Sequence, residues 1–250
     1  MIDDVLTSVA EGVASVTLNR PAKKNSITRS MYTALADALD AAEADADVRA
    51  VVLQGDESVF CAGNDIGDFV GRPQAGPDDP GFRFLRTIAR FPKPLVAGVC
   101  GPAVGVGATM LLHCDLVYAG EGATLVFPFV DLGLVPEAGS SLLLPQAVGH
   151  QRAAAALMLG EPVPAAAALG AGLVNRVLPD TEVLGYARAQ AGRLAAKPAA
   201  ALVETKRLLR SGTQAALLDR IEDEGAVFTR LLGEPAAQAA LRAFLARSDA

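Results

Sequence analysis

The stretch from Lys93 to Asp115, KPLVAGVCGPAVGVGATMLLHCD, constrains the fold of this chain more than any other. Its apolar run, Leu95 to Cys100, is too short for a helix and is bounded by a proline and a glycine, which predicts a buried strand. A glycine turn follows, and Ala108 to His113 then predicts a helix buried nearly all round. Such a unit leaves main-chain N–H groups unpaired at the helix start, where the helix dipole favours a negative charge.

The glycines of this turn match neither common phosphate-binding pattern. They do not follow G-x-G-x-x-G, and no Gly-Lys-Ser/Thr comes after them, so a dinucleotide loop and a Walker-type loop are both unsupported. A plainer alternative is that the glycines only let a helix pack closely on a strand. The local sequence leaves that alternative open.

Composition narrows the class of partner. The 250 residues can bury a large core, and no apolar run approaches the roughly 18 residues of a membrane span. The acidic start lacks the pattern of a secretory signal, and the formal charge of −6 argues against nucleic acid. The three cysteines have no metal-type spacing. We therefore expect a cytoplasmic protein with reduced thiols, no bound metal and no membrane partner.

Strands alternate with helices over the first three-quarters of the chain, which predicts a layered α/β core. A hairpin is expected at Glu11-Gly12, and a helix is expected to begin at Thr28 or Ser30. The chain is expected to be helical from about Glu182 to its end. Further expected strands are Val48 to Gln54, Asp115 to Ala119, Thr124 to Phe127 and Leu173 to Leu178, and further expected helices are Phe82 to Arg90, Gln151 to Leu159 and Pro164 to Gly170.

A second glycine loop, Gly55 to Phe69, also follows a buried strand. Gly63 lets the chain turn sharply and leaves the amide of Asn64 pointing inward, as the amide of Val106 does in the first loop. Two such donors on one oxygen form an oxyanion hole, worth about 2.7–4 kcal/mol per donor. The run Gly71 to Pro80, rich in Gly, Pro and Asp, is expected to be mobile and to order over a ligand.

Four basic residues gather near the N-terminus, within an otherwise acidic chain: Arg20, Lys23, Lys24 and Arg29. Basic side chains on a solvated turn are common, so this cluster alone is ambiguous. Its functional interpretation is a docking point for an anionic, phosphate-bearing ligand.

Three segments, FCAGNDIGDF, GPAVGVGATMLLHCDLVYAG and PFVDLGLVPEAGSSLLLP, resemble the crotonase superfamily, the enoyl-CoA hydratase/isomerase family, in their order and spacing. The opening LNRPAKKNSIT and the helical tail fit as well, so the resemblance covers essentially the whole chain. It implies a crotonase-like ββα spiral core over residues 1–195. It also implies a C-terminal helical region, residues 196–250, that mediates formation of homotrimers or of hexamers built from them.

The resemblance implies a site for an acyl-CoA thioester, with coenzyme A entering as part of the substrate and no separate cofactor. The amides of Asn64 and Val106 would contribute the two oxyanion donors. The basic cluster would then meet the anionic part of coenzyme A. By the resemblance, the residues that line the coenzyme A path are Ala22, Lys23, Lys24, Ala62, Asp65 and Ile66.

The catalytic carboxylates distinguish members of the family. The two glutamates of the hydratases align with Thr109 and Phe129, neither of which is a base, so both are expected only to contact substrate. Glu137, in GLVPEAGSS, stands where the 3,2-enoyl-CoA isomerases carry their single glutamate. Its apolar neighbours Phe127, Phe129 and Leu134 are expected to desolvate it and raise its pKa.

Other interpretations remain open at this stage. A carboxylate such as Glu137 is also favourable near a helix N-terminus for the dipole alone. The same fold and thioester are compatible with hydration or with a ring-forming or ring-opening step. A protein that binds acyl-CoA without turnover is a third possibility. We expect His113 and His150 to be structural, and Cys61 lacks a paired histidine that would make it a nucleophile.

Overall fold

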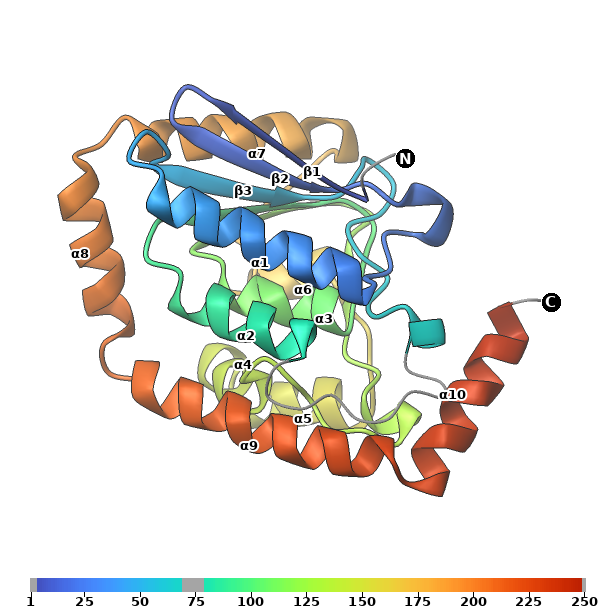
Figure 1. The fold of residues 1–250 in the computed structure, drawn as a ribbon. Coiled ribbons are helices and arrows are strands. Elements are labelled where there is room, and N and C mark those ends of the chain that lie inside the picture. Colours follow the sequence, from blue (N-terminus) through green and yellow to red (C-terminus); the bar gives the residue numbers. More distant parts are fainter. Residues whose placement is uncertain (1–3, 69–78, 249–250) are drawn as a thin grey trace.

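A six-stranded sheet organises the computed structural model, which describes residues 4–68 and 79–248 (Figure 1). The strand order is β1-β2-β3-β4-β6-β9; β1 is antiparallel to β2, and all other neighbours are parallel. The α/β class expected from the sequence is thus confirmed. Most of the expected mobile run, residues 71–78, lies outside the described residues. The strands are β1 (Val5–Ala10), β2 (Val13–Leu18), β3 (Ala50–Gln54), β4 (Leu95–Val99), β6 (Leu116–Gly120) and β9 (Arg176–Leu178).

Both faces of the central strands β3 and β4 are buried, because helices cover each of them. In Figure 1, α7 (Asp180–Ala195) lies over one face, while α1 (Arg29–Ala44) and α2 (Pro80–Arg90) lie on the other side. Alternate side chains divide accordingly: Val52 and Val96 pack in the cluster that includes the alanines of α7, and Val51 packs in the main core. Burial on both faces explains why β3 and β4 appear in the sequence as continuous apolar runs.

A smaller sheet lies beside the first and was missed in part by the sequence. It consists of β5 (Pro102–Val104), β7 (Thr124–Val126) and β8 (Val163–Pro164), with β5 parallel to β7 and β7 antiparallel to β8. The prediction of a simple turn after the central strand was therefore wrong. Pro102–Val104 forms a strand because its main chain pairs with segments far away in the sequence.

The local turn and capping signals give the expected elements. Glu11 and Gly12 both have positive φ, at 50° and 76°, as a tight two-residue hairpin turn requires. Thr28 caps α1 by accepting a hydrogen bond from the N–H of Met31 at 3.3 Å. No helix in the described ranges is both long and apolar enough to cross a membrane. The other helices are α3 (Val106–Thr109), α4 (Ser140–Val148), α5 (His150–Met158), α6 (Ala165–Gly170), α8 (Ala199–Arg210), α9 (Gln214–Leu232) and α10 (Pro235–Ser248).

The central helix differs from its prediction in both start and type. It begins two residues earlier than expected, at Val106, and continues from Met110 to His113 as a tighter 3₁₀ turn. The tightening is completed where the N–H of Cys114 donates to the carbonyl of Leu111, three residues back, at 3.1 Å. The early start matters because it makes Val106 the first helical residue, whose N–H has no partner within the helix.

The close packing of α3 on the neighbouring loop yields a stability prediction. A β-carbon on Gly107 would lie 2.7 Å from Cβ of Cys61 and 2.8 Å from its carbonyl oxygen. Gly107→Ala is expected to lower the free energy of unfolding by about 1–3 kcal/mol, because the backbone must move to admit it. Urea denaturation measures this free energy.

The matched control is Gly192→Ala in α7, where an added β-carbon meets nothing within 4 Å. That change is expected to stabilise by about 0.5–1 kcal/mol. Equal effects of the two changes would contradict the packing.

Candidate active site

The two glycine loops meet through main-chain hydrogen bonds. The N–H of Cys61 donates to the carbonyl of Pro102 at 3.1 Å, and the N–H of Val104 donates to the carbonyl of Cys61 at 2.8 Å. A β-carbon on Gly63 would lie only 2.9 Å from the carbonyl oxygen of Val104. The loops are therefore in direct contact, although some forty residues separate them in the chain.

The main chain of Asn64 is oriented by a second bridge. The N–H of Ile27 donates to the carbonyl of Gly63 at 2.8 Å, and the N–H of Asp65 donates to the carbonyl of Ile27 at 2.9 Å. In this parallel pattern the N–H of the intervening Asn64 points away from Ile27. The side-chain oxygen of Asn64 accepts a hydrogen bond from the hydroxyl of Tyr32, which further limits its movement.

The amide of Val106 stands at the start of α3. The carbonyl of Gly105 accepts hydrogen bonds from the N–H groups of Ala108 and Thr109, both at 2.9 Å, and this closes the first turn. Val106 itself is buried and precedes that closure, so its N–H has no intrahelical acceptor. A donor of this kind, at the positive end of a helix, stabilises a negatively charged oxygen.

Glu137 is a buried carboxylic acid. The residue is 8% exposed, and its Oε1 atom has no hydrogen-bond partner within the part of the chain that the structure describes. Burial, followed by the charge of Glu224, raises the pKa of Glu137 to about 8. Glu137 in turn contributes to raising the pKa values of Tyr32 and Cys61, after their own burial. The carboxyl group is thus close to the loop that carries Asn64.

A cavity of about 690 Å³ opens beside these groups. Its lining includes Asn64 and most of the residues expected to contact substrate: Ala22, Lys23, Lys24, Ala62, Asp65, Ile66 and Phe129. Thr109 is fully buried away from this lining, and its hydroxyl donates to the carbonyl of Val106 at 3.4 Å. Val106 and Glu137 also lie outside the lining. The cavity therefore joins the predicted coenzyme A path to the Asn64 loop.

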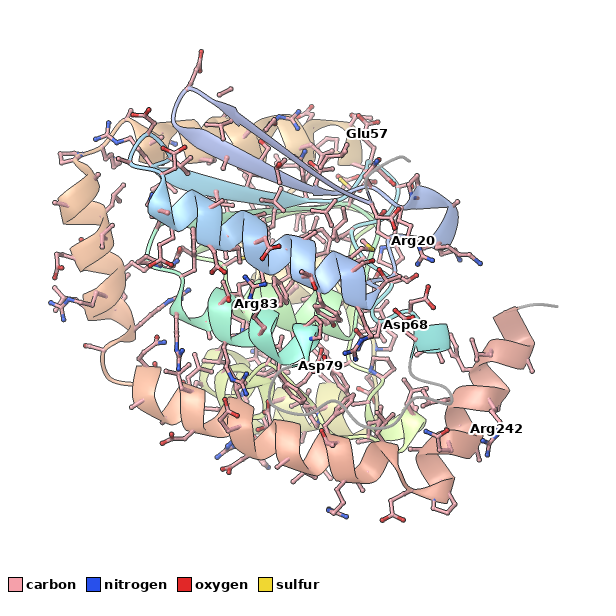
Figure 2. All side chains as sticks on the ribbon, in the orientation of Figure 1. Arg20, Glu57, Asp68, Asp79, Arg83 and Arg242 are labelled. Atoms are coloured by element: carbon pink, nitrogen blue, oxygen red, sulfur yellow. The ribbon has the colours of Figure 1, made fainter. Side chains whose placement is uncertain are left out.

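The basic loop at the mouth of the cavity has a defined shape. Asn25 is fully buried and donates to the carbonyls of Val59 and Phe60 at 3.1 and 3.3 Å, while Lys24 adopts a left-handed conformation with φ of 51°. Arg20 donates to Asp65 at 2.7 Å, and Figure 2 shows it on the same side of the molecule as Asp68. These contacts leave the ammonium groups of Lys23 and Lys24 exposed, where they can meet phosphate.

The opposite wall of the cavity is apolar and comes largely from the C-terminal helices. Sequence patterns did not assign the residues of these helices to a site, because their helical spacing is equally typical of a core. This wall consists of Pro128, Leu132, Leu134, Phe228, Leu241, Phe244 and Leu245. Such a surface suits an apolar acyl group. Within residues 4–68 and 79–248 no cluster of three or more His, Cys, Asp or Glu residues is arranged to hold a metal ion.

Comparison with known proteins places this geometry in a family. The model of the enoyl-CoA hydratase/isomerase family matches residues 8–250, so the chain belongs to this family of the crotonase superfamily, whose enzymes act on acyl-CoA substrates. It is 34% identical to 1,2-epoxyphenylacetyl-CoA isomerase of Escherichia coli (strain K12), over 99% of this chain and 97% of that protein. It is 38% identical to enoyl-CoA delta isomerase 2 of Rattus norvegicus, over 71% of this chain and 46% of that protein.

The fold expected from the resemblance is confirmed by the solved structures. The structure of Pseudomonas aeruginosa OdaA superposes with a TM-score of 0.95 at 44% identity, and the match covers 97% of this chain and 99% of that one. The chain is therefore a crotonase-fold enzyme of acyl-CoA metabolism. Family membership alone does not select between hydration and isomerisation.

Two residues near the site escaped the sequence analysis. Tyr32 was hidden in the apolar stripe of α1, where an aromatic residue is ordinary. Glu224 had a detectable signal, because it interrupts the buried stripe of α9 formed by Leu217, Ile221 and Phe228. A carboxylate at a core position of a helix needs a polar partner.

The raised pKa of Glu137 predicts how stability depends on pH. Between about pH 4.5 and pH 8 the folded protein keeps this carboxyl protonated while the unfolded chain ionises, so the group disfavours folding increasingly as pH rises. Glu137→Gln removes that penalty. The variant is expected to be about 1–3 kcal/mol more stable than the parent at pH 8 and nearly equal to it at pH 5. Chemical denaturation at the two pH values measures the difference.

The exposed Glu204, on α8, provides the control for this experiment. Glu204→Gln is expected to change stability by less than about 0.5 kcal/mol at both pH values. If Glu137→Gln gave the same change at pH 5 and pH 8, the carboxyl group would not be desolvated in solution.

Proposed function

We propose that this protein is an enoyl-CoA isomerase that converts a 3-enoyl-CoA into a 2-enoyl-CoA, with Glu137 as its single proton shuttle. The observation that carries the proposal is the buried carboxyl of Glu137. One of its oxygens lacks a hydrogen-bond partner among the described residues, and the group lies near the Asn64 loop. A buried polar atom without a partner is costly to folding, so a role in the reaction accounts for its retention.

The reaction needs one base and one oxyanion site. The ionised carboxylate of Glu137 removes a proton from C2, and the electron pair of that C–H bond delocalises onto the thioester oxygen to form a dienolate. The amides of Asn64 and Val106 donate hydrogen bonds to this oxygen. Glu137 then returns the proton to C4, the dienolate collapses, and the double bond lies between C2 and C3. No water is consumed, and the base returns to its starting state.

Two observations favour isomerisation over hydration. By the family resemblance, Thr109 and Phe129 align with the two hydratase carboxylates, and neither side chain can activate water. In addition, the hydroxyl of Thr109 is fully buried and donates to a main-chain carbonyl. Hydration would need a second acid–base group, and neither of these positions supplies one.

Substrate binding follows from the two ends of the cavity. Lys23 and Lys24 would pair with the phosphates of coenzyme A, and the apolar wall from α9 and α10 would receive the acyl chain. Coenzyme A enters as part of the thioester, so the proposed reaction requires no separate cofactor.

A second candidate reaction is favoured by the relative that matches nearly the whole chain. That relative is named 1,2-epoxyphenylacetyl-CoA isomerase. The alternative reaction to test is therefore the isomerisation of an epoxidised arylacetyl-CoA. It would use the same thioester anchor.

Replacing Glu137 tests the proposal. Glu137→Gln keeps the size of the side chain but removes the base, so isomerisation of a 3-enoyl-CoA is expected to fall by about 10²–10⁴-fold. Affinity for a saturated acyl-CoA, measured by calorimetry, is expected to stay within a few-fold. Conversion is followed by the absorbance of the conjugated 2-enoyl thioester.

The other outcomes identify the alternatives. Hydration of a 2-enoyl-CoA that survived Glu137→Gln would favour a hydratase. Turnover of the epoxidised arylacetyl-CoA alone would favour the second candidate. Tight acyl-CoA binding with no product from any of these substrates would indicate a binding protein.

We further propose that the chain forms homotrimers, alone or paired into hexamers, as the family resemblance implies. In support, Leu208 and Leu209 on α8 are 62% and 80% exposed, and Figure 1 shows α8 at the edge of the molecule. Leu209→Glu is expected to shift the trimer toward monomer in light scattering, because it places a charge on an apolar contact. Arg207→Glu, on the same helix, is the control. A monomeric parent would contradict the proposal.

A further inference from the structure

The loop that carries Glu137 is held in an unfavourable backbone conformation. Ala138 has a φ of 62°, and Gly139 follows with a φ of 69°. A left-handed conformation is unfavourable for a non-glycine residue, because its β-carbon crowds the following carbonyl oxygen. Such strain persists only where surrounding contacts impose it. The contacts that hold Ala138 and Gly139 are therefore informative about Glu137.

One contact comes from the helix of the oxyanion loop. Nε2 of His113 lies 2.8 Å from the carbonyl oxygen of Ala138. Burial lowers the pKa of His113 to about 4, so the ring is neutral, and Nε2 must carry the hydrogen because a carbonyl only accepts. His113 thus ties the Glu137 loop to the segment that begins with Val106.

The other contacts come from α9, more than eighty residues further along the chain. The two carboxylate oxygens of Glu224 accept hydrogen bonds from the N–H of Gly139 at 2.6 Å and from the N–H of Ser141 at 2.9 Å. Arg220 donates to the hydroxyl of Ser141 at 3.0 Å. The approach is close, because a β-carbon on Gly139 would lie 2.2 Å from Cδ1 of Leu217.

We infer that Glu224 is a positioning residue: it holds the loop of Glu137 in the reactive conformation and acts on that base through its negative charge. The inference rests on the proposed role of Glu137. Glu224 is 6% exposed, and its two oxygens accept hydrogen bonds from the N–H groups of Gly139 and Ser141. It therefore fixes the strained turn from the side opposite His113.

After burial, the charge of Glu224 is the second cause of the raised pKa of Glu137, and Arg220 is an opposing charge that acts on Glu224. The other titratable groups that interact with Glu137 are Tyr32 of α1 and Cys61 of the Asn64 loop, and burial raises the pKa values of both, so both are neutral. Burial also raises the pKa of Glu224, whereas its two N–H partners and Arg220 favour its ionised form. Both oxygens of Glu224 accept N–H hydrogen bonds, an arrangement that suits a carboxylate.

A purely structural cap would make the same hydrogen bonds, so the test must separate capping from electrostatic action. The pH dependence of kcat/KM does this, because it reports the pKa of the free base. In the parent protein kcat/KM is expected to rise with pH, with a midpoint at about pH 8, because only ionised Glu137 removes a proton. Removing a neighbouring negative charge is expected to move that midpoint to lower pH.

The experiment compares Glu224→Gln with Glu222→Gln on the same helix, where Glu222 is exposed and pairs with Arg86. Glu224→Gln is expected to lower the midpoint by roughly 0.5–1 pH unit. It is also expected to lower kcat by about tenfold or more with little change in KM, because the amide replaces one of the two accepting oxygens with an NH2 group that only donates. Glu222→Gln is expected to match the parent in both respects. A folded Glu224→Gln protein with an unchanged midpoint would overturn the inference.

Glu224→Asp separates charge from contact and serves if the glutamine variant fails to fold. It keeps the negative charge but withdraws the oxygens, so kcat is expected to fall while the midpoint stays near that of the parent. If Glu224→Asp left kcat unchanged and lowered the midpoint of the pH profile as far as is expected for Glu224→Gln, the positioning role would also be refuted.

A measurement without turnover keeps this test distinct from the proposed reaction. The gain in stability from Glu137→Gln is determined across pH in the parent and in the Glu224→Gln background. The pH at which the gain stops growing is expected to be lower in the second background. If no enoyl-CoA were isomerised but this pH still shifted, the proposed function would fail while the coupling held. An unshifted pH would refute the coupling, whatever the activity.

Discussion

The main-chain bridge between Cys61 and Ala103 is the contact on which the site depends. It joins the loop after β3 to the strand after β4, and it uses backbone groups that side-chain substitutions cannot replace. Because hydrogen bonds and close glycine packing fix both loops at once, the amides of Asn64 and Val106 are set before any substrate arrives. In the proposed enolate reaction, preorganised donors of this kind would need no rearrangement when charge develops.

Several features near this bridge lower the stability of the folded protein. A protonated carboxyl at Glu137, a left-handed Ala138 and a second buried acid at Glu224 each disfavour the folded state. Such features concentrate where function requires them. The extensive apolar burial of the sheet and its helices offsets these unfavourable features, so the α/β core stabilises a fold that contains a strained loop.

The C-terminal helices do more than the sequence analysis expected. Phe228, Leu241 and Phe244 line the cavity, and Glu224 holds the loop of the base from α9. Helices α9 and α10 therefore contribute directly to the proposed site, whatever their part in oligomerisation. The signal for Glu224 was present as a charge within an apolar helical stripe. Its partners were not predictable, since they are main-chain N–H groups far away in the sequence.

The sequence by itself determined the alternating elements, the hairpin at Glu11-Gly12, the cap at Thr28 and, through its motifs, the family. These features depend on local backbone preferences and on short patterns of burial, which neighbouring residues decide. Only the tertiary structure decided that Pro102–Val104 is a strand, that Val106 begins its helix, and that Glu224 binds the loop of Glu137. Each of these depends on contacts between segments distant in the chain, and neighbouring residues do not determine which distant segment will be the partner.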